Sequence, residues 1–205
     1  MSFDVDTLQN HLPSYLSAED QRALVDGLKD ISQSGGGEYV LPRSRDSFAQ
    51  TMLQGDGWHG FVVYSFANSK VQEVPGIVLS NSCDVAPENE RDFATRVTFA
   101  PLAKLAVFEN LLHESGIDAS RVEDKLKSIR AQKITNLFYL PAGGQLEHDY
   151  VVRLDEAQSM PISVHTKNPT RSKLFTLSPT GFYMLVFKLS IHFCRLQERV
   201  QRKAH

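Results

Sequence analysis

The sequence predicts an α+β protein, in which short antiparallel strands are combined with helices at both ends of the chain and with one helical insertion. Three observations support this prediction. Short segments rich in β-branched and aromatic residues, such as Phe61–Phe66, are separated by turn residues. Two stretches with helical spacing interrupt them between Leu102 and Gln132, and a long apolar helix follows Ser178.

The composition is that of an ordinary globular protein. With 205 residues, 41% of them hydrophobic and 22% charged, the chain can bury one core. It lacks an apolar run of the roughly 18 to 20 residues that cross a membrane, and its start lacks the pattern of a signal peptide. We therefore expect a cytoplasmic protein with no membrane partner, whose two cysteines, Cys83 and Cys194, are reduced thiols.

Residues 1–57 are predicted to form a helical arm and a linker. Ser17 has the character of a helix N-cap, acidic residues follow it in the first turn, and the helix ends near Ser32. The glycine run Gly35–Gly37 makes a flexible break, so that residues 33–57 join the arm to the main body.

The main domain, residues 58–205, is predicted to begin with the strands Phe61–Phe66, Pro75–Ser80 and Arg96–Pro101. We expect Pro75 at the first position of its strand, because proline has no N–H to donate to a ladder. Apolar residues occupy both faces of these strands. The sheet is therefore expected to be covered on both sides or rolled into a barrel.

A helical hairpin is predicted as an insertion over residues 102–133. Leu102–His113 and Ala119–Gln132 have helical spacing, and Ser115–Asp118 between them contains a helix stop followed by a cap. Strands resume after the insertion, at Asn136–Leu140, Tyr150–Leu154, Pro161–Val164 and Lys173–Thr176.

The last element is a long C-terminal helix over residues 178–203. Ser178 is its expected N-cap, and Pro179 occupies the first helical position, where a missing N–H costs nothing. The first half of this helix is apolar almost all round. We expect it to be wedged into the fold and to emerge from about Lys188 onward.

The first three strands share their pattern with a known family. A Gly-Phe-Val-Val-Tyr strand comes first, Pro75 then starts a strand that ends in Val-Leu-Ser, and a further apolar strand ends in Ala-Pro-Leu. This stretch, Gly57–Pro101, resembles the barrel core of MazF/PemK-like toxin ribonucleases. The resemblance implies a small antiparallel β-barrel of the Src-homology-like type, in a bacterial toxin-like or defence-associated protein that binds RNA.

Two positions differ from the pattern of that family. An arginine just before the strand-initial proline and a threonine or serine soon after the later proline carry RNA cleavage in the family. Here Val74 precedes Pro75, and Leu102 follows Pro101. Cleavage would thus need a rearranged site, with an arginine stabilising the phosphate and a carboxylate acting as base. The candidate catalytic residues are Ser82, Cys83, Asp84, Arg153 and Arg171.

The polar stretch Ser80–Asp84 leaves a strand end, and two interpretations stay open. Small polar residues commonly cap turns there through their own backbone bonds. Alternatively, Cys83 and Asp84 lie at the barrel mouth, where Cys83 would need a neighbouring base to act as a nucleophile. The histidines that could serve as that base are His59, His113, His148 and His165.

A metal site could use Cys83, Asp84, His148 and Asp149, but the strong ligand spacings of metal proteins are absent from the sequence. We therefore predict neither a metal nor a cofactor.

Charge is unevenly distributed along a chain whose formal net charge is −2. Residues 119–133 carry five cations against two acids, and a second basic stretch covers residues 188–203. Both suit RNA phosphates or are simply solvated helix faces. The lone tryptophan, Trp58, could stack on a base or anchor its own loop. The candidate nucleic-acid-binding residues are Trp58, Arg121, Lys125, Lys127, Arg130 and Lys133.

The leading functional hypothesis is an RNA-binding, toxin-like barrel protein, with cleavage by a rearranged site as an added activity. One alternative is a non-catalytic module that docks on a protein partner through its C-terminal helix. A second alternative is a cysteine- or metal-dependent enzyme, which needs a histidine within reach of Cys83.

Overall fold

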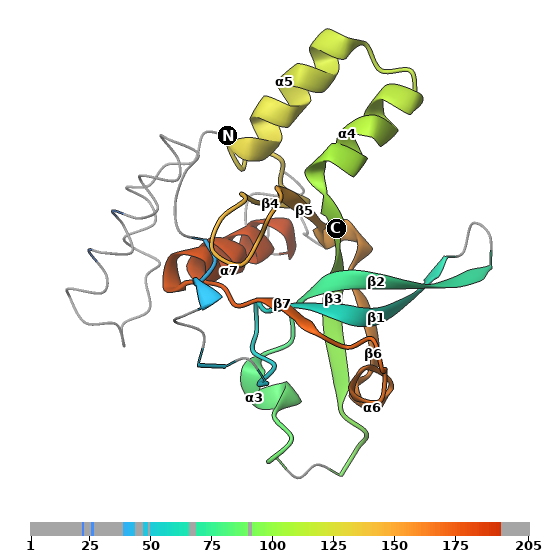
Figure 1. The fold of residues 1–205 in the computed structure, drawn as a ribbon, viewed down its shortest axis with the longest axis vertical. Coiled ribbons are helices and arrows are strands. Elements are labelled where there is room, and N and C mark those ends of the chain that lie inside the picture. Colours follow the sequence, from blue (N-terminus) through green and yellow to red (C-terminus); the bar gives the residue numbers. More distant parts are fainter. Residues whose placement is uncertain are drawn as a thin grey trace, which may run out of the picture.

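The computed structural model describes residues 22, 26, 39–43, 47–48, 50–65, 69–89 and 92–193. Within them, a seven-stranded antiparallel sheet is combined with five α-helices (Figure 1). The α+β class predicted from the sequence is confirmed. The predicted N-terminal helix, Ser17–Ser32, lies outside the described residues apart from Arg22 and Asp26.

The strands follow one another across the sheet in the order β4, β5, β3, β2, β1, β7, and β6 also pairs with β3. All pairs are antiparallel. The strands are β1 (Gly57–Ser65), β2 (Lys70–Val78), β3 (Arg96–Lys104), β4 (Leu137–Leu140), β5 (Tyr150–Arg153), β6 (Gln158–Pro161) and β7 (Lys173–Phe175).

The sheet is not closed into a barrel, because no ladder joins β4 to β7 among the described residues. Instead, the segment Tyr39–Leu41 lies beside the chain that follows β7. The N–H of Leu41 donates to Thr176 O over 2.9 Å, and the Tyr39 ring packs against Phe138 of β4, with the ring centroids 6.2 Å apart. This segment therefore lies between the chain after β7 and β4. The predicted closure into a Src-homology-like barrel is not confirmed.

The outer edge of β3 is covered by one interrupted strand. Leu102 pairs with Val152 of β5, and Phe99 pairs with Gln158 of β6. Between these pairs the chain makes a short 3₁₀ turn, η3 (Leu154–Glu156), whose Leu154 is fully buried. The turn acts as a bulge, which lets the strand change direction and cover both halves of β3.

Two predicted strand details are wrong. Pro75 lies inside β2 rather than at its start, opposite a bulge of β1 where its missing N–H is not needed. Pro161–Val164 is not a strand, because β6 ends at Pro161 and helix α6 (Ile162–Thr166) begins directly after it. The packing of His165 overrides the β propensity of this segment: its ring stacks on Phe61 with a 4.4 Å centroid distance.

The helical hairpin is confirmed as α4 (Leu105–Glu114) and α5 (Ala119–Arg130), which project from the C-terminal end of β3 (Figure 1). β3 runs three residues past Pro101, so the insertion starts later than predicted. Asp118 caps α5 as expected, because its carboxylate accepts the N–H of Ser120 over 2.9 Å.

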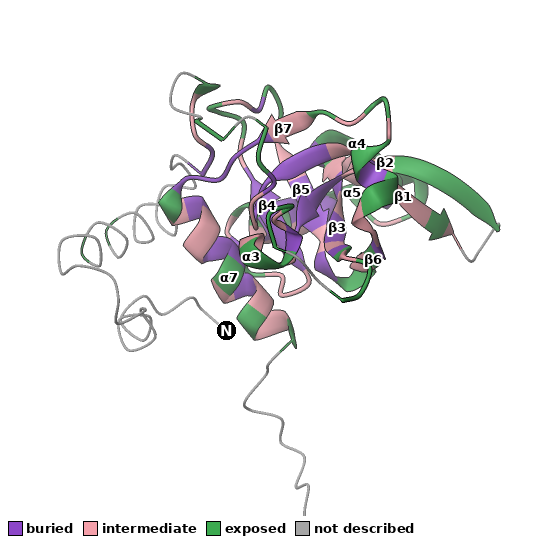
Figure 2. Cartoon of the chain, turned by 90° about the horizontal axis from the view of Figure 1, so that it is seen from below, coloured by how far each residue is buried: buried purple, intermediate pink, exposed green. Residues whose placement is uncertain are grey.

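The C-terminal helix α7 (Pro179–Phe193) packs its buried face against the sheet beside β4 and β5 (Figure 2). Ser178 caps it through the N–H of Gly181. The helix emerges directly after Lys188, since residues 189–193 are half-buried or exposed, but Lys188 itself is only 1% exposed. Its ammonium donates to Gln132 O over 3.0 Å and to Ile134 O over 2.6 Å, so it caps the chain that leaves α5. The rest of the predicted helix, residues 194–203, lies outside the described residues.

Candidate functional site

A bulge in β1 shapes the candidate site. Trp58 pairs with Gly76 and Phe61 pairs with Val74, so that His59 and Gly60 together face Pro75. Gly60 has a φ of 90°, in the region that favours glycine, and a Cβ on it would lie 3.2 Å from Arg171 Cα. The bulge therefore lets the loop after α6 approach β1 closely.

Side-chain hydrogen bonds hold this loop on the ribbon of β1 and β2. The amide of Asn168 donates to Gly60 O over 3.1 Å and to the Glu73 carboxylate over 3.0 Å. Thr170 donates to the other oxygen of the same carboxylate, and these bonds hold the pKa of Glu73 below its ordinary value. Ser172, directly after Arg171, accepts the N–H of His59 through its carbonyl, so the backbone is held on both sides of Arg171.

Arg171 lies over the ring of Trp58, with its Cζ 4.4 Å from the ring centroid. The ammonium of Lys173 lies 5.6 Å from the same centroid. Trp58 is only 2% exposed, and its ring meets the ring of His165 edge-on at 5.9 Å. The tryptophan is therefore a fixed platform with two cations near it, which is the geometry of a cation–π interaction.

Lys173, whose ammonium lies near the Trp58 ring, forms a buried ion pair with Asp56. Lys173 Nζ lies 2.8 Å from Asp56 Oδ2, and the two side chains are 7% and 1% exposed. Lys173 also donates to the carbonyls of Phe48 and Thr51 over 2.7 and 3.0 Å. Burial raises the pKa of Asp56 to about 6, although its hydrogen bonds with Lys173 and with the N–H of Leu53 act in the opposite direction.

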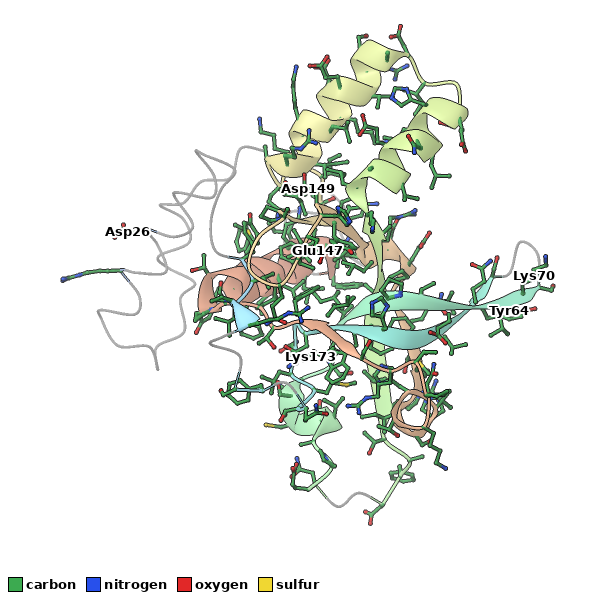
Figure 3. The ribbon with its side chains drawn as sticks, in the orientation of Figure 1. Asp26, Tyr64, Lys70, Glu147, Asp149 and Lys173 are labelled. Carbon is green, nitrogen blue, oxygen red and sulfur yellow. The ribbon has the colours of Figure 1, made fainter. Side chains whose placement is uncertain are left out.

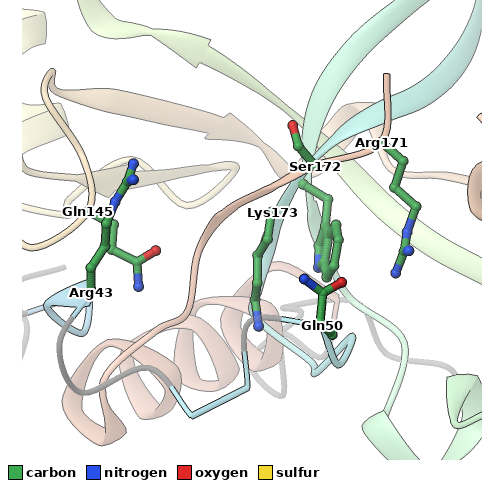
Figure 4. Close-up of a pocket in the computed structure, with 7 residues that line it drawn as sticks. Arg43, Gln50, Gln145, Arg171, Ser172 and Lys173 are labelled. Atoms are coloured by element: carbon green, nitrogen blue, oxygen red, sulfur yellow. The ribbon is translucent and has the colours of Figure 1, made fainter. Parts of the chain in front are cut away.

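These residues line or support a pocket of about 450 Å³. Figure 4 shows Arg43 and Gln145 on one side of it and Arg171 on the other, with Lys173 and Gln50 between them. The lining residues are Arg43, Gln50, Trp58, Gln145, Arg171, Ser172 and Lys173. Three of them are cationic and none is a carboxylate, so the pocket favours an anionic ligand.

Unpartnered polar atoms gather in the same region. Among the described residues, the buried side-chain atoms without a hydrogen-bond partner are Asp56 Oδ1, Trp58 Nε1, His165 Nδ1 and Arg171 Nε. Buried polar atoms in proteins are normally satisfied, so such a concentration calls for a functional explanation.

The protonation state of His165 follows from its neighbours. Its Nε2 lies 2.9 Å from His59 O, and a carbonyl can only accept, so Nε2 carries the proton. Burial lowers the pKa of His165, and the charge of Arg171 lowers it further. The ring is therefore neutral near pH 7, and its Nδ1 presents an unused acceptor.

Two residues that the sequence nominated for different roles, Trp58 for nucleic-acid binding and Arg171 for catalysis, are thus in direct contact. The other nominated catalytic residues lie elsewhere. Arg153 is engaged by Asp155 and Glu156 at 3.1 Å each, at the end of β5.

Ser82, Cys83 and Asp84 lie on the short helix α3 (Ser82–Val85), which Asn81 caps through the N–H of Cys83. Ser82 accepts the N–H of Gln54 over 2.9 Å, and Asp84 is exposed. Asp84 lines a second pocket of about 590 Å³ together with Arg96, and this pocket shares no lining residue with the first. The stretch Ser80–Asp84 is therefore capped and tied to its own surroundings, as in the first of the two interpretations of this turn.

The nominated basic residues of α5 do not surround Asp84. Helices α5 and α3 lie at opposite ends of the longest axis of the molecule (Figure 1). Lys127 pairs with Glu123 at 2.9 Å, and Arg130 lies 3.8 Å from Asp149, which Figure 3 shows near the base of α5. Arg121, Lys125 and Lys133 complete the nominated set, and all but the half-buried Lys125 are exposed.

The cysteine- or metal-dependent alternative gains no support from the described residues. Cys83 carries an exposed thiol, whereas His165 lies against Trp58 with its Nε2 bound to a backbone carbonyl. Throughout the described residues, no group of three or more His, Cys, Asp or Glu side chains is placed to hold a metal ion.

Sequence reasoning missed Asp56, Lys173, Arg43 and the two glutamines of the pocket. The Gly-Asp-Gly turn directly before Trp58 is the one signal that could have drawn attention to Asp56. A buried ion pair between residues so far apart in the chain has no local sequence signature.

Comparison with models of known protein families gives no match for this chain, and comparison with curated protein sequences gives none either. The resemblance of Gly57–Pro101 to the MazF/PemK-like toxins therefore stays a prediction. No helix in the described ranges has both the length and the apolar character needed to cross a membrane.

Proposed function

We propose that the protein binds RNA and that the pocket lined by Trp58 of β1 and Lys173 of β7 holds one of its phosphate groups. The observation that supports this most directly is the pair of guanidinium groups, Arg43 and Arg171, on opposite sides of a pocket without a carboxylate in its lining (Figure 4). Neither arginine has an ion-pair partner among the described residues. A guanidinium group can bind two oxygens of one phosphate through two parallel, charge-assisted hydrogen bonds.

The aromatic floor favours a nucleic acid over a simple anion. Proteins that bind single strands combine cations for the backbone with aromatic rings for the bases, and Trp58 supplies such a ring directly beside Arg171. The pocket volume of about 450 Å³ also falls in the range of small-ligand sites.

The proposal concerns binding rather than cleavage. Asp56, the carboxylate that pairs with Lys173 of the pocket, is 1% exposed, so it is not placed to act as a base on a ligand in the pocket. Asp84, the carboxylate nominated from the sequence, lines the other pocket. We expect RNA to stay intact when it is incubated with the protein and followed on a gel.

The test is the affinity for a labelled single-stranded RNA, measured by fluorescence anisotropy at about 50 mM and about 200 mM salt. Each phosphate contact to a single strand contributes about 0.7 to the slope of log K against log salt. Arg171→Ala and Arg43→Ala are each expected to weaken binding and to reduce this slope by about 0.7.

The matched control is Arg121→Ala, which removes an exposed arginine from α5, at the far end of the molecule. We expect it to leave both affinity and slope unchanged. If Arg121→Ala weakens binding while the two pocket variants do not, the RNA site lies on α5 and the pocket assignment is wrong. Absence of binding at low salt would refute the proposed function as a whole.

A further inference from the structure

The proposed function can be taken one step further, to the kind of RNA that fits. We propose that the pocket takes one unpaired nucleotide, whose base stacks on Trp58 in the place of the Arg171 guanidinium while that guanidinium turns to the phosphate. This inference rests on the proposed function, and it defines the substrate class as single-stranded rather than duplex RNA.

The interaction of Arg171 with Trp58 is weak enough to be replaced by an interaction of Arg171 with a bound phosphate. The Nε of Arg171 is buried without a hydrogen-bond partner, and no carboxylate pairs with it among the described residues. Its contact with the indole is a cation–π interaction, whereas a phosphate would offer paired, charge-assisted hydrogen bonds. A bound phosphate therefore competes well for the guanidinium.

The backbone of Arg171 would not have to move for this exchange. Asn168 and Thr170 bind the ribbon of β1 and β2, and Ser172 O accepts the N–H of His59 over 2.8 Å. The loop on both sides of Arg171 is thus held in place. Only the side chain needs to swing from the indole toward the open pocket.

Trp58 is held in place by its packing, so its ring stays where it is when the side chain of Arg171 turns away. It is buried, its neighbour Gly57 lies against the ring of Phe175, and His165 closes its edge. A ring that is already fixed loses little conformational entropy when a base stacks on it. Removal of the guanidinium would expose one face of this ring to the pocket.

The rest of the lining suits the edge of a base. Gln50 and Gln145 carry amides, which both donate and accept hydrogen bonds, and Ser172 carries a hydroxyl. Bases inside a duplex are stacked on their own neighbours and cannot reach such a platform. Single-stranded segments, whose bases can turn outward, are recognised by stacking on aromatic side chains.

Trp58 is the only tryptophan of the chain, so its fluorescence reports directly on the exchange. The probes are a single-stranded RNA oligonucleotide, the same oligonucleotide in a duplex, and ribose 5-phosphate, which has a phosphate but no base. We expect the single strand to quench the emission of Trp58 strongly. The duplex and ribose 5-phosphate should not produce this quenching at concentrations that compete for the site, because neither places a base on the ring.

Arg171→Ala provides the second measurement, because it removes the guanidinium without touching the platform. Affinity for the single strand is expected to fall about tenfold, through the loss of a charged hydrogen-bond partner, while the quenching at saturation is retained. A purely electrostatic site would lose affinity in this variant and show no quenching in either protein.

The outcomes separate the two proposals. If the anisotropy shows salt-sensitive, Arg171-dependent binding of RNA but Trp58 emission does not change, the stacking inference is wrong and the proposed function stands. Equal quenching by duplex and single strand would also overturn the inference. If no RNA binds at low salt, the proposed function has failed and the inference fails with it.

Discussion

The buried ion pair between Asp56 and Lys173 leads to a prediction whose sign is not obvious from the geometry. A lysine 2.8 Å away would be expected to favour the ionised carboxylate. Burial nevertheless dominates and raises the pKa of Asp56 from 3.8 to about 6. The native state therefore holds a proton that the unfolded chain has already lost between these two values.

The direction of the pH effect follows from this difference. The contribution of Asp56 to stability is fully present below pH 3.8 and is lost as the pH rises through about 6. A difference of about 2 pKa units corresponds to about 3 kcal/mol of unfolding free energy. About 2 kcal/mol of this loss falls between about pH 4 and about pH 7.

The assay compares urea unfolding of the wild type with that of Asp56→Asn across this pH range. The variant cannot titrate at this position, so subtracting its unfolding free energy cancels the other groups. The wild-type value minus the variant value should decrease by about 2 kcal/mol as the pH rises from about 4 to about 7.

Asp155→Asn is the matched control, with an effect of the opposite sign. Burial acts to raise the pKa of Asp155, but hydrogen bonds from Arg153 and Asn136 hold it below its ordinary value. Its difference curve should therefore rise with pH in the acid range. A difference for Asp56→Asn that is flat, or that also rises with pH, would refute the reasoning, because it would mean that the ion pair outweighs burial.

Two further predictions concern the bulge and the buried lysine. Gly60→Ala puts a Cβ 3.2 Å from Arg171 Cα at a φ of 90°, so we expect about 1–3 kcal/mol less stability in urea unfolding and weaker RNA binding by anisotropy. Unchanged binding would show that the bulge does not position Arg171. For Lys188, burial lowers the pKa to about 8 from 10.5. The unfolding free energy of the wild type minus that of Lys188→Met should therefore rise by about 3 kcal/mol as the pH increases from about 8 to about 10.5, and a flat difference would contradict the cost of burying this charge.

Elements with local signals could be predicted from the sequence. The start of α5 is set by the carboxylate of Asp118 and the start of α7 by Ser178, and both caps are formed as the residue types suggest. The packing of Tyr39–Leu41 between β4 and the chain after β7 has no such local signal. This segment contacts Thr176 and Leu177, far along the chain, and its glycine-rich context made it resemble a linker.

The candidate site, too, could be predicted from the sequence only in part. Trp58 and Arg171 could be nominated by residue type, because a lone tryptophan and an arginine in a loop suit RNA. Their contact depends on the bulge at Gly60, which becomes visible only when the register of β1 against β2 is known. Asp84 was nominated from a polar turn, and most of that turn's polar groups serve to cap α3 and hold Gln54.

The position of Tyr39–Leu41 has a consequence for how the chain is made. During synthesis this segment leaves the ribosome long before Leu177, with which Val40 forms a bridge. Until then Tyr39 and Val40, each at most 3% exposed in the finished protein, lack the part of their surroundings that the chain after β7 supplies. Completion of this part of the core must therefore wait for Leu177 and its neighbours, and folding of this half of the core is expected to follow translation rather than accompany it.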